Sequence, residues 1–202
     1  PGMPGAIQLS GEAALRCGAG RVSIATHPSH HTVISAVRPE LMCHAIEKIS
    51  DLKPLLSKVD TLAIGPGLGT NKWGRNLFNE VVKLDLPMVV DADALNLLAN
   101  SSVRHDNWIL TPHPGEAGRL LGVTAGVIQE DRLSAVTALR DKYGGTIVLK
   151  GAGSLVSSMD GPAWISTSGN SGMASPGMGD ALTGVIAALL AQGVPSEQAA
   201  AF

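Results

Sequence analysis

Apolar and polar positions follow two spacings along the chain, and the order of these spacings predicts the class of fold. Short apolar or β-branched runs bounded by Gly, Pro or Asp are typical of buried strands, and they lie at residues 21–26, 61–64, 87–90, 108–111 and 146–150. Apolar residues three or four positions apart predict helices over residues 6–17, 73–83, 94–99, 115–121 and 130–143. Strands that alternate with helices predict an α/β fold, in which a parallel sheet is covered on both faces.

Two further elements are expected near the end of the chain. Residues 154–158 and 163–167 flank the turn signal Asp160-Gly161-Pro162, so they predict a hairpin that adds an antiparallel edge to the sheet. A helix over residues 181–192 has one apolar face, formed by Leu182, Val185, Ile186, Leu189 and Leu190. The expected architecture is a mostly parallel sheet with an antiparallel hairpin at its edge.

The length and composition indicate one folded domain over residues 1–202 and favour a small-molecule ligand. With 202 residues, of which 45% are hydrophobic and 16% charged, the chain can bury one sizeable core. The formal net charge of −2 and the isoelectric point near 6.3 give no field that attracts DNA, RNA or an anionic membrane surface. Aromatic residues make up 3% of the chain, which leaves little surface for stacking of bases. We therefore expect neither nucleic acid nor membrane among the partners.

The ends of the chain indicate where the protein acts and how much of it is present. No apolar run reaches the roughly 18 residues of a membrane span, and residues 1–5 lack the basic-then-apolar profile of a signal peptide. These features favour a soluble, cytoplasmic protein. Pro1 begins a loop sequence and Phe202 lies in a helical-looking stretch without a stop signal, so we expect a domain that is truncated at both ends.

The glycine-rich segment before the last long helix is the first candidate for chemistry. Gly169, Gly172, Gly177 and Gly179 precede the helix that starts near Asp180. Glycine lets the backbone approach a ligand with its N–H groups turned inward, and a helix start adds partial positive charge, so the segment predicts a phosphate site. A carboxylate beside a bound phosphoryl group can accept a proton from an attacking hydroxyl, which makes Asp180 a candidate base. The alternative is that Asp180 only stabilises the first helical turn.

A second glycine-rich loop follows the predicted strand at residues 61–64. Gly65 and Gly67, with Asp91 24 residues beyond Gly67, mimic the fingerprint of dinucleotide-binding folds. The third glycine of that fingerprint is missing, because Thr70 stands in its place, and Pro66 stiffens the turn. The loop predicts a backbone that approaches a ligand closely, with a tight strand-to-helix turn as the alternative.

Two acids follow the predicted strand at residues 87–90. Asp91 ends the strand, and it is a candidate for contact with Mg²⁺ or with a substrate hydroxyl. Asp93 suits the N-cap of the next helix. We expect the site, if it lies here, to use Asp91 rather than Asp93.

Polar side chains also follow the next two predicted strands. His113 stands between two prolines that fix its path, which favours contact with a ligand. Glu116 lies in the first helical turn, where an acid is favourable even without a ligand. Lys150 is followed by Gly151 and suits pairing with a nucleotide's phosphate or ribose, with an ordinary strand-end lysine as the alternative.

Four segments together resemble the ADP/ATP-dependent NAD(P)H-hydrate dehydratases in their order and spacing. They are residues 91–96, residues 111–116, Lys150-Gly151, and residues 170–180 from Asn170 to Gly177-Met178-Gly179-Asp180. The resemblance covers almost the whole chain and implies a ribokinase-like fold, which is a three-layer α/β/α sandwich. In bacteria such a domain is often half of a bifunctional repair enzyme, so the resemblance also implies fusion to an N-terminal NAD(P)H-hydrate epimerase domain, within a homo-oligomer.

Carried over position by position, the resemblance implies which residues bind each ligand. The hydrated nucleotide, NADHX or NADPHX, would contact Ala6, Gly67, His113, Asn170 and Asp180. The adenine nucleotide would be held by Lys150, Gly151, Ala152, Gly153, Ser154 and Gly179. The catalytic groups would be Asp180 and the amides of Gly177 and Gly179. Mg²⁺ would bridge the nucleotide phosphates through water held by Glu116 or Asp91.

The implied activity is an ADP-dependent hydro-lyase reaction that repairs a damaged cofactor, with ATP as the other candidate donor. Phosphorylation of the ring hydroxyl turns a poor leaving group into a good one, and loss of phosphate restores NADH or NADPH. One alternative is a ribokinase-like kinase of a vitamin-precursor alcohol, which would stop at the phosphorylated product. Another is a Rossmann-type dinucleotide-binding dehydrogenase, favoured by residues 65–69 with Asp91, which would need no phosphoryl donor.

Overall fold

The main sheet of the computed structural model, which describes residues 2–159 and 161–201, has six strands in the order β3-β4-β5-β6-β7-β8. Its parallel part consists of β3 (Leu62–Ile64), β4 (Met88–Val90), β5 (Trp108–Leu110) and β6 (Thr146–Leu149). Its antiparallel edge consists of β7 (Leu155–Ser157) and β8 (Trp164–Ile165). The expected mostly parallel sheet with an antiparallel hairpin is therefore confirmed, and Asp160 of the predicted turn lies outside the described residues.

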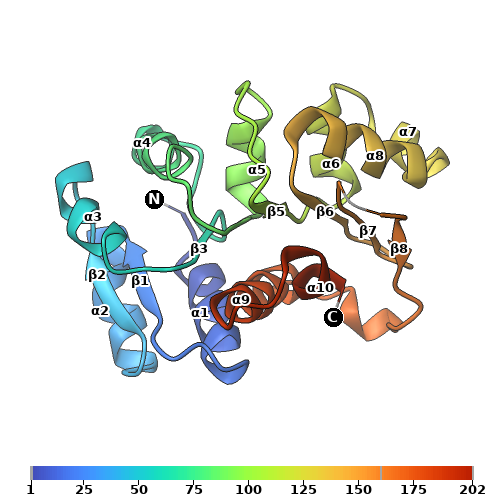
Figure 1. The fold of residues 1–202 in the computed structure, drawn as a ribbon. Helices are drawn as coiled ribbons and strands as arrows, with labels where there is room; N and C mark the ends of the chain where they lie inside the picture. The colour runs from blue at the N-terminus through green and yellow to red at the C-terminus, as the bar shows by residue number, and fades with distance from the viewer. Residues whose placement is uncertain (1, 160, 202) are drawn as a thin grey trace.

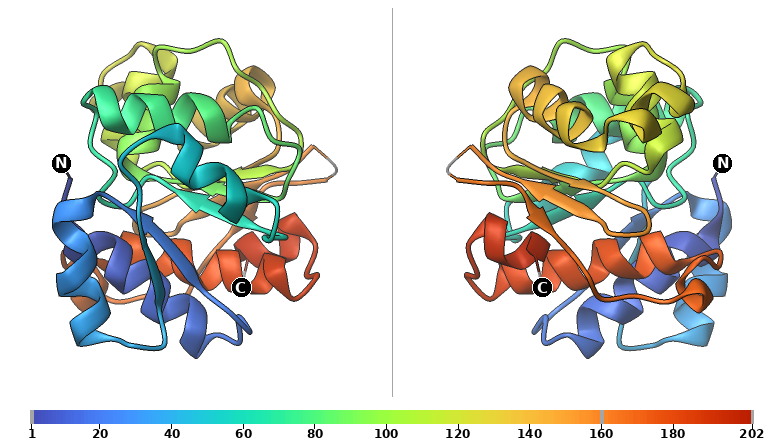
Figure 2. Two further views of the ribbon diagram at one scale, coloured as in Figure 1. Left: turned by 90° about the vertical axis from the view of Figure 1, so that its left-hand side faces the viewer. Right: turned by 90° about the vertical axis from the view of Figure 1, so that its right-hand side faces the viewer.

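Helices cover both faces of this sheet, as Figures 1 and 2 show. One layer contains α4 (Lys72–Val81), α5 (Ala92–Leu98), α6 (Pro114–Leu121) and α8 (Arg132–Tyr143). The other layer contains α9 (Met178–Ala191) and α10 (Ser196–Ala201). Alternate strand residues point to opposite faces, so Met88 and Val90 pack into the first layer and Val89 into the second. The result is the expected three-layer α/β/α arrangement.

The N-terminal part of the chain forms a smaller unit that was only partly predicted. α1 (Pro4–Arg16) packs along α9. The strand expected at residues 21–26 is β1 (Ser23–Thr26), but it pairs in parallel with β2 (Met42–Ala45) in a separate two-stranded sheet. Ile24 of β1 is buried against Ile34 and Leu41 in a small core of its own.

Four short elements complete the structure. They are α2 (Pro28–Val37), α3 (Ile49–Leu56), α7 (Ala125–Glu130) and the 3-10 helix η1 (Ser171–Met173). The helix expected over residues 130–143 begins instead at Arg132, because Asp131 accepts a hydrogen bond from the Ser134 amide and caps it. In the part of the chain that the structure describes, no helix is both long and apolar enough to cross a bilayer.

Candidate functional site

Four loops meet where the parallel strands end. Since β3, β4, β5 and β6 are neighbours and run in parallel, their carboxyl ends share one edge of the sheet. The residues that follow them are Gly65, Asp91, Thr111 and Lys150. The first turns of α9 reach the same edge, because Thr183 of α9 contacts Asp91. This edge therefore brings together most of the predicted site residues.

A buried ion pair lies at the centre of this edge. The Lys150 ammonium donates a hydrogen bond to Oδ1 of Asp91 over 2.7 Å, although the two residues are 59 positions apart in the chain. The other carboxylate oxygen, Oδ2, accepts a hydrogen bond of 2.9 Å from the Thr183 hydroxyl. Asp91 is 1% exposed, so protein groups replace water around its charge. Lys150 keeps 20% of its side chain exposed, and its Nζ also lies 3.9 Å from Oε2 of Glu116.

The start of α9 offers backbone N–H groups beside this ammonium. Gly177 is the N-cap residue and has φ 90°, a left-handed conformation that favours glycine. Among the described residues, the amides of Gly179 and Asp180 have no acceptor, as expected for a first helical turn. A Cβ added at Gly179 would lie 3.2 Å from Nζ of Lys150 and 3.7 Å from Oδ2 of Asp91. Ammonium, free amides and the helix dipole therefore converge, which is the chemistry of an anion site.

Asp180 is half-buried in that first turn. Burial raises the pKa of its carboxyl above the ordinary value, the charge of Asp91 raises it further, the Lys150 ammonium lowers it, and Asp93 adds a smaller upward effect. Within the described part of the chain, its carboxylate accepts no hydrogen bond, while its backbone carbonyl accepts one of 2.8 Å from the Ser10 hydroxyl. Asp180 is thus an unpaired carboxylate whose pKa is raised, as suits a general base.

His113 and Glu116 lie together at the start of α6, and Glu116 is in the first helical turn, as expected. His113 is the N-cap of α6, and its Nδ1 accepts hydrogen bonds from the Gly115 and Glu116 amides over 3.0 and 3.3 Å. The Glu116 carboxylate in turn accepts a hydrogen bond of 2.9 Å from the His113 amide, which completes a capping box. This capping role leaves the predicted contact between His113 and a ligand untested, so it stays a prediction. Its ring is still half-exposed, with Nε2 3.5 Å from Oε1 of Glu116.

The loop after β3 folds against its own chain. Gly65 has φ 128°, and a Cβ there would overlap the carbonyl oxygen of Asp91. The amide of Gly69 donates a hydrogen bond of 2.8 Å to Oδ2 of Asp93. The prediction that Asp93 caps α5 was wrong, since Asp91 is the N-cap residue and Asp93 instead ties down the glycine loop. Ala92 between them has φ 46°, so the backbone is strained at this edge.

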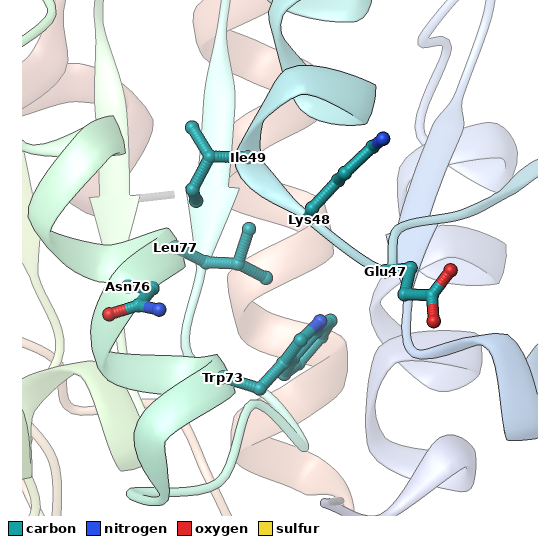
Figure 3. Close-up of a pocket in the computed structure, with 6 residues that line it drawn as sticks. All are labelled: Glu47, Lys48, Ile49, Trp73, Asn76 and Leu77. Carbon is teal, nitrogen blue, oxygen red and sulfur yellow. The ribbon is translucent and has the colours of Figure 1, made fainter.

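A hollow next to this loop contains one of the predicted substrate contacts. It is lined by Ile7, Ala25, Thr26, Ala63, Ile64, Gly65, Pro66, Gly67, Leu68 and Trp73. Ala6 adjoins it, because a Cβ added at Gly67 would touch the Ala6 Cβ at 3.4 Å. A separate hollow is lined by Glu47, Lys48, Ile49, Trp73, Asn76 and Leu77, none of them a predicted site residue (Figure 3). Of the two hollows, the one that includes Gly67 is therefore the better candidate for binding the substrate.

The loop that follows β6 is held in place by an arginine. The Arg132 guanidinium donates hydrogen bonds to the carbonyl oxygens of Ala152 and Leu149 over 2.6 and 3.1 Å. Within the loop, the Ser154 hydroxyl donates a hydrogen bond of 3.1 Å to the carbonyl oxygen of Gly151, and it accepts a hydrogen bond of 3.3 Å from the Gly151 amide. Gly153 has φ 67° and Gly151 φ 151°, so both glycines adopt backbone conformations that other residues rarely take. The segment Lys150 to Ser154 is thus a shaped loop beside the ion pair.

Asn170 and the two acids proposed for Mg²⁺ need separate description. Asn170 is exposed and caps η1, since its Oδ1 accepts 2.9 Å from the Gly172 amide. Oxygens of Asp91 and Glu116 are already engaged by protein donors. In residues 2–159 and 161–201 there is no group of three His, Cys, Asp or Glu side chains that could hold a metal ion.

Three residues that contribute to this geometry were not predicted from the sequence. They are Thr183, which bonds Asp91, Arg132, which holds the loop after β6, and Ser10, which bonds the carbonyl of Asp180. A signal existed for Thr183, because it is a polar residue within the apolar face of α9. None existed for Arg132 or Ser10, whose contacts join segments far apart in the chain.

A three-layer α/β/α sandwich that brings Lys150, Asp91 and Asp180 together at its strand ends is the arrangement of the ribokinase-like class, and a solved structure described as a ribokinase-like superfamily protein aligns with it at a TM-score of 0.84 and 31% identity. The model of the NAD(P)H-hydrate dehydratase family matches residues 1–202, so the chain belongs to this family. The expected family and fold class are both confirmed.

Individual relatives agree with this assignment. The chain is 50% identical over 191 residues to a bifunctional NAD(P)H-hydrate repair enzyme, Nnr, of Coxiella burnetii. The aligned region makes up 95% of this chain and 39% of that enzyme. It is 38% identical to an ADP-dependent (S)-NAD(P)H-hydrate dehydratase of Neisseria meningitidis, covering 98% of the chain and 69% of the relative. The structure of an ADP/ATP-dependent NAD(P)H-hydrate dehydratase of Bacillus subtilis, co-crystallised with ATP/Mg²⁺, aligns with a TM-score of 0.82 and 30% identity over 98% of the chain and 72% of its own. The chain thus spans about two fifths of the Coxiella relative's length.

Proposed function

We propose that this protein is an ADP-dependent (S)-NAD(P)H-hydrate dehydratase, a hydro-lyase that restores NADH or NADPH from the hydrated forms NADHX and NADPHX. The observation that carries the proposal is the unpaired Asp180 carboxylate, which lies beside the free amides of α9 and the Lys150 ammonium. A base next to an anion site is the arrangement needed to phosphorylate an alcohol. The names of the relatives from Neisseria and Coxiella support the same reaction.

The chemistry proceeds in two steps at this site. Asp180 accepts the proton of the ring hydroxyl, and the ring oxygen bonds to the β-phosphorus of ADP while the bond to the bridging oxygen breaks and AMP leaves. The amides of Gly177 and Gly179 and the Lys150 ammonium stabilise the phosphoryl oxygens. In the second step the carbon–oxygen bond breaks, and phosphate leaves with the ring oxygen while the ring nitrogen supplies the electron pair. The neighbouring ring carbon then loses a proton to the released phosphate or to water, which forms the ring double bond of the reduced cofactor. The products are AMP, phosphate and the reduced cofactor.

The binding residues follow from this assignment. We place the hydrated ring near Gly67, Ala6, His113 and Asn170, and the adenine nucleotide along the loop from Lys150 through Gly151, Ala152 and Gly153 to Ser154, with Gly179 at its phosphates. The hollow beside Gly67 and the shaped loop after β6 support the two placements. ADP is preferred over ATP as donor because the Neisseria relative is ADP-dependent.

Magnesium fits the site as an ion carried by the nucleotide. Mg²⁺ keeps several waters and binds through few carboxylates plus phosphates, and Glu116 and Asp91 lie near Lys150 but have oxygens engaged by protein donors. Water held by Glu116 or Asp91 is therefore the contact we propose, and the ion would neutralise phosphate charge. The Bacillus subtilis relative was co-crystallised with ATP/Mg²⁺.

The protein is further proposed to carry a fused N-terminal epimerase domain, which would make it multifunctional. The bifunctional Coxiella relative, of which the chain covers 39%, supports this. The single-domain extent over residues 1–202, the homo-oligomeric state and the cytoplasmic location remain predictions from the sequence.

One assay tests the activity directly. The protein is incubated with NADHX and either ADP, ATP or no donor, and absorbance at the reduced-nicotinamide wavelength is followed while the products are separated. We expect recovery of NADH with ADP, accompanied by equal amounts of AMP and phosphate. Equal recovery without any donor would contradict the proposal, and accumulation of a stable phosphorylated product would indicate a kinase instead.

A further inference from the structure

We propose that Thr183 is a positioning residue for the dehydratase reaction: through Asp91, it holds the Lys150 ammonium against the first turn of α9. The inference rests on the proposed function, because it assigns a task to a side chain in the same site. In this role Thr183 contacts neither the substrate nor the phosphoryl group, and it acts only through Asp91 and Lys150.

The position of Thr183 in its helix is the first reason. It is the only hydroxyl-bearing residue between Met178 and Ala191 and is 0% exposed, within the face of α9 that packs on the sheet. A threonine in a helix commonly bonds the carbonyl one turn before it. The Thr183 hydroxyl instead donates a hydrogen bond of 2.9 Å to Oδ2 of Asp91, which follows β4 and lies 92 residues earlier in the chain. The contact is therefore made to Asp91 rather than to its own helix.

The state of Asp91 is the second reason. Its carboxylate is 1% exposed and has one protein donor on each oxygen, Lys150 on Oδ1 and Thr183 on Oδ2. Without the threonine hydroxyl, Oδ2 would lose its hydrogen bond where little water reaches it, and the carboxylate would be free to turn. Lys150 has a long flexible side chain, so its ammonium stays in place only while Asp91 does.

The space around the ammonium is the third reason. A side chain at Gly179 would lie 3.2 Å from the Lys150 ammonium and 3.7 Å from Oδ2 of Asp91. The glycine thus leaves the ammonium next to the backbone of the helix start, where the proposed phosphoryl oxygens bind. A displacement of the ammonium removes positive charge from that place without changing the substrate hollow near Gly67.

The test compares Thr183→Val, which keeps the shape but loses the hydroxyl, with Thr183→Ser, which keeps the hydroxyl. Since one hydrogen bond to a charged group is at stake, we expect Thr183→Val to lower kcat/KM for ADP by roughly tenfold or more. The KM for NADHX should change less than about twofold, and Thr183→Ser should restore most of the loss. Thr137→Val, in α8, is the matched control, because that hydroxyl bonds the carbonyl of Leu133 in its own helix. It should leave both parameters unchanged.

Binding of ADP, measured by calorimetry, and combination with Lys150→Met complete the test. On the Lys150→Met background, Thr183→Val should cost nothing further in ADP binding, because the group that it positions is gone. Full activity of Thr183→Val, equal losses in Thr183→Val and Thr183→Ser, or additive losses with Lys150→Met would each overturn the inference. If the wild-type protein binds ADP but restores no NADH, the proposed function fails, while the binding comparison still decides the role of Thr183.

Discussion

Asp180→Asn is expected to lower kcat by roughly a thousandfold, because removal of a general base typically costs between 10²- and 10⁴-fold. The carboxylate lies in the first turn of α9 and accepts no hydrogen bond from the described residues, so the amide can replace it without disturbing a contact. The KM for ADP should change little, since asparagine leaves the backbone amides of α9 in place. Steady-state kinetics with NADHX and ADP measure both parameters, and a variant with near-wild-type kcat would exclude Asp180 as the base.

The same substitution should not destabilise the fold. Burial, with help from Asp91, raises the pKa of Asp180 in the folded state, so its protonated form is favoured by folding and its charged form is not. The stability that this group contributes is present below its unfolded pKa and is lost as the pH rises through the raised folded pKa. At pH 7 the ionised carboxylate therefore opposes folding, and Asp180→Asn should melt at the wild-type temperature or above it. A clear fall in Tm would show that Asp180 has a structural task.

The pH dependence of turnover follows from the same shift. Asp180 must be ionised to accept a proton, so kcat/KM should fall as the pH drops through its raised pKa. The acidic limb of the profile is therefore expected above the range of an ordinary aspartate, whose pKa is about 3.9. A limb at or below that value would contradict the assignment.

Lys150→Met is expected to have the second-largest effect, and to affect stability as well as turnover. The substitution removes the ammonium from the anion site and leaves the Asp91 carboxylate, 1% exposed, without its cationic partner. Loss of one partner of a buried pair costs about 3–5 kcal/mol, and the lower end applies because 20% of the Lys150 side chain is exposed. Chemical denaturation measures the free energy of unfolding, and phosphoryl transfer measured in parallel should be reduced by at least tenfold.

Two further variants separate charge from shape. Lys83→Met is the surface control, because Lys83 pairs with Glu80 while 68% of its side chain is exposed, and it should cost less than about 1 kcal/mol. In the double variant Lys150→Met with Asp91→Asn, the buried charge is gone, so stability should largely return while activity stays low. If the double variant is no more stable than Lys150→Met, the unpaired charge is not the cause of the loss.

The central strands were predictable because burial on both faces leaves a continuous apolar run. Met88, Val89 and Val90 of β4 are all buried, and such runs stand out in the sequence. β2 was missed because it is four residues long and half-exposed, with no alternation of apolar and polar positions. α3 was missed because Pro54 lies inside it, a residue that usually ends a helix.

The candidate site was predictable as a set of strand ends, and its contacts were not. Asp91 and Lys150 each follow a buried strand, so their common edge could be expected. Their pairing and the hydroxyl of Thr183 depend on how α9 packs across the sheet, which no local pattern encodes. Asp93 was assigned to the wrong task for the same reason, since its partner, the amide of Gly69, lies 24 residues before it.

The fate of one oxygen atom tests the central claim most directly. NADHX labelled with ¹⁸O on its ring hydroxyl is converted in unlabelled water with ADP, and the released phosphate is examined by mass spectrometry. If Asp180 and the amides of α9 direct the hydroxyl onto phosphorus, one ¹⁸O atom appears in each phosphate. Unlabelled phosphate, with the label recovered in water, would mean that the hydroxyl leaves without being phosphorylated and would contradict the account.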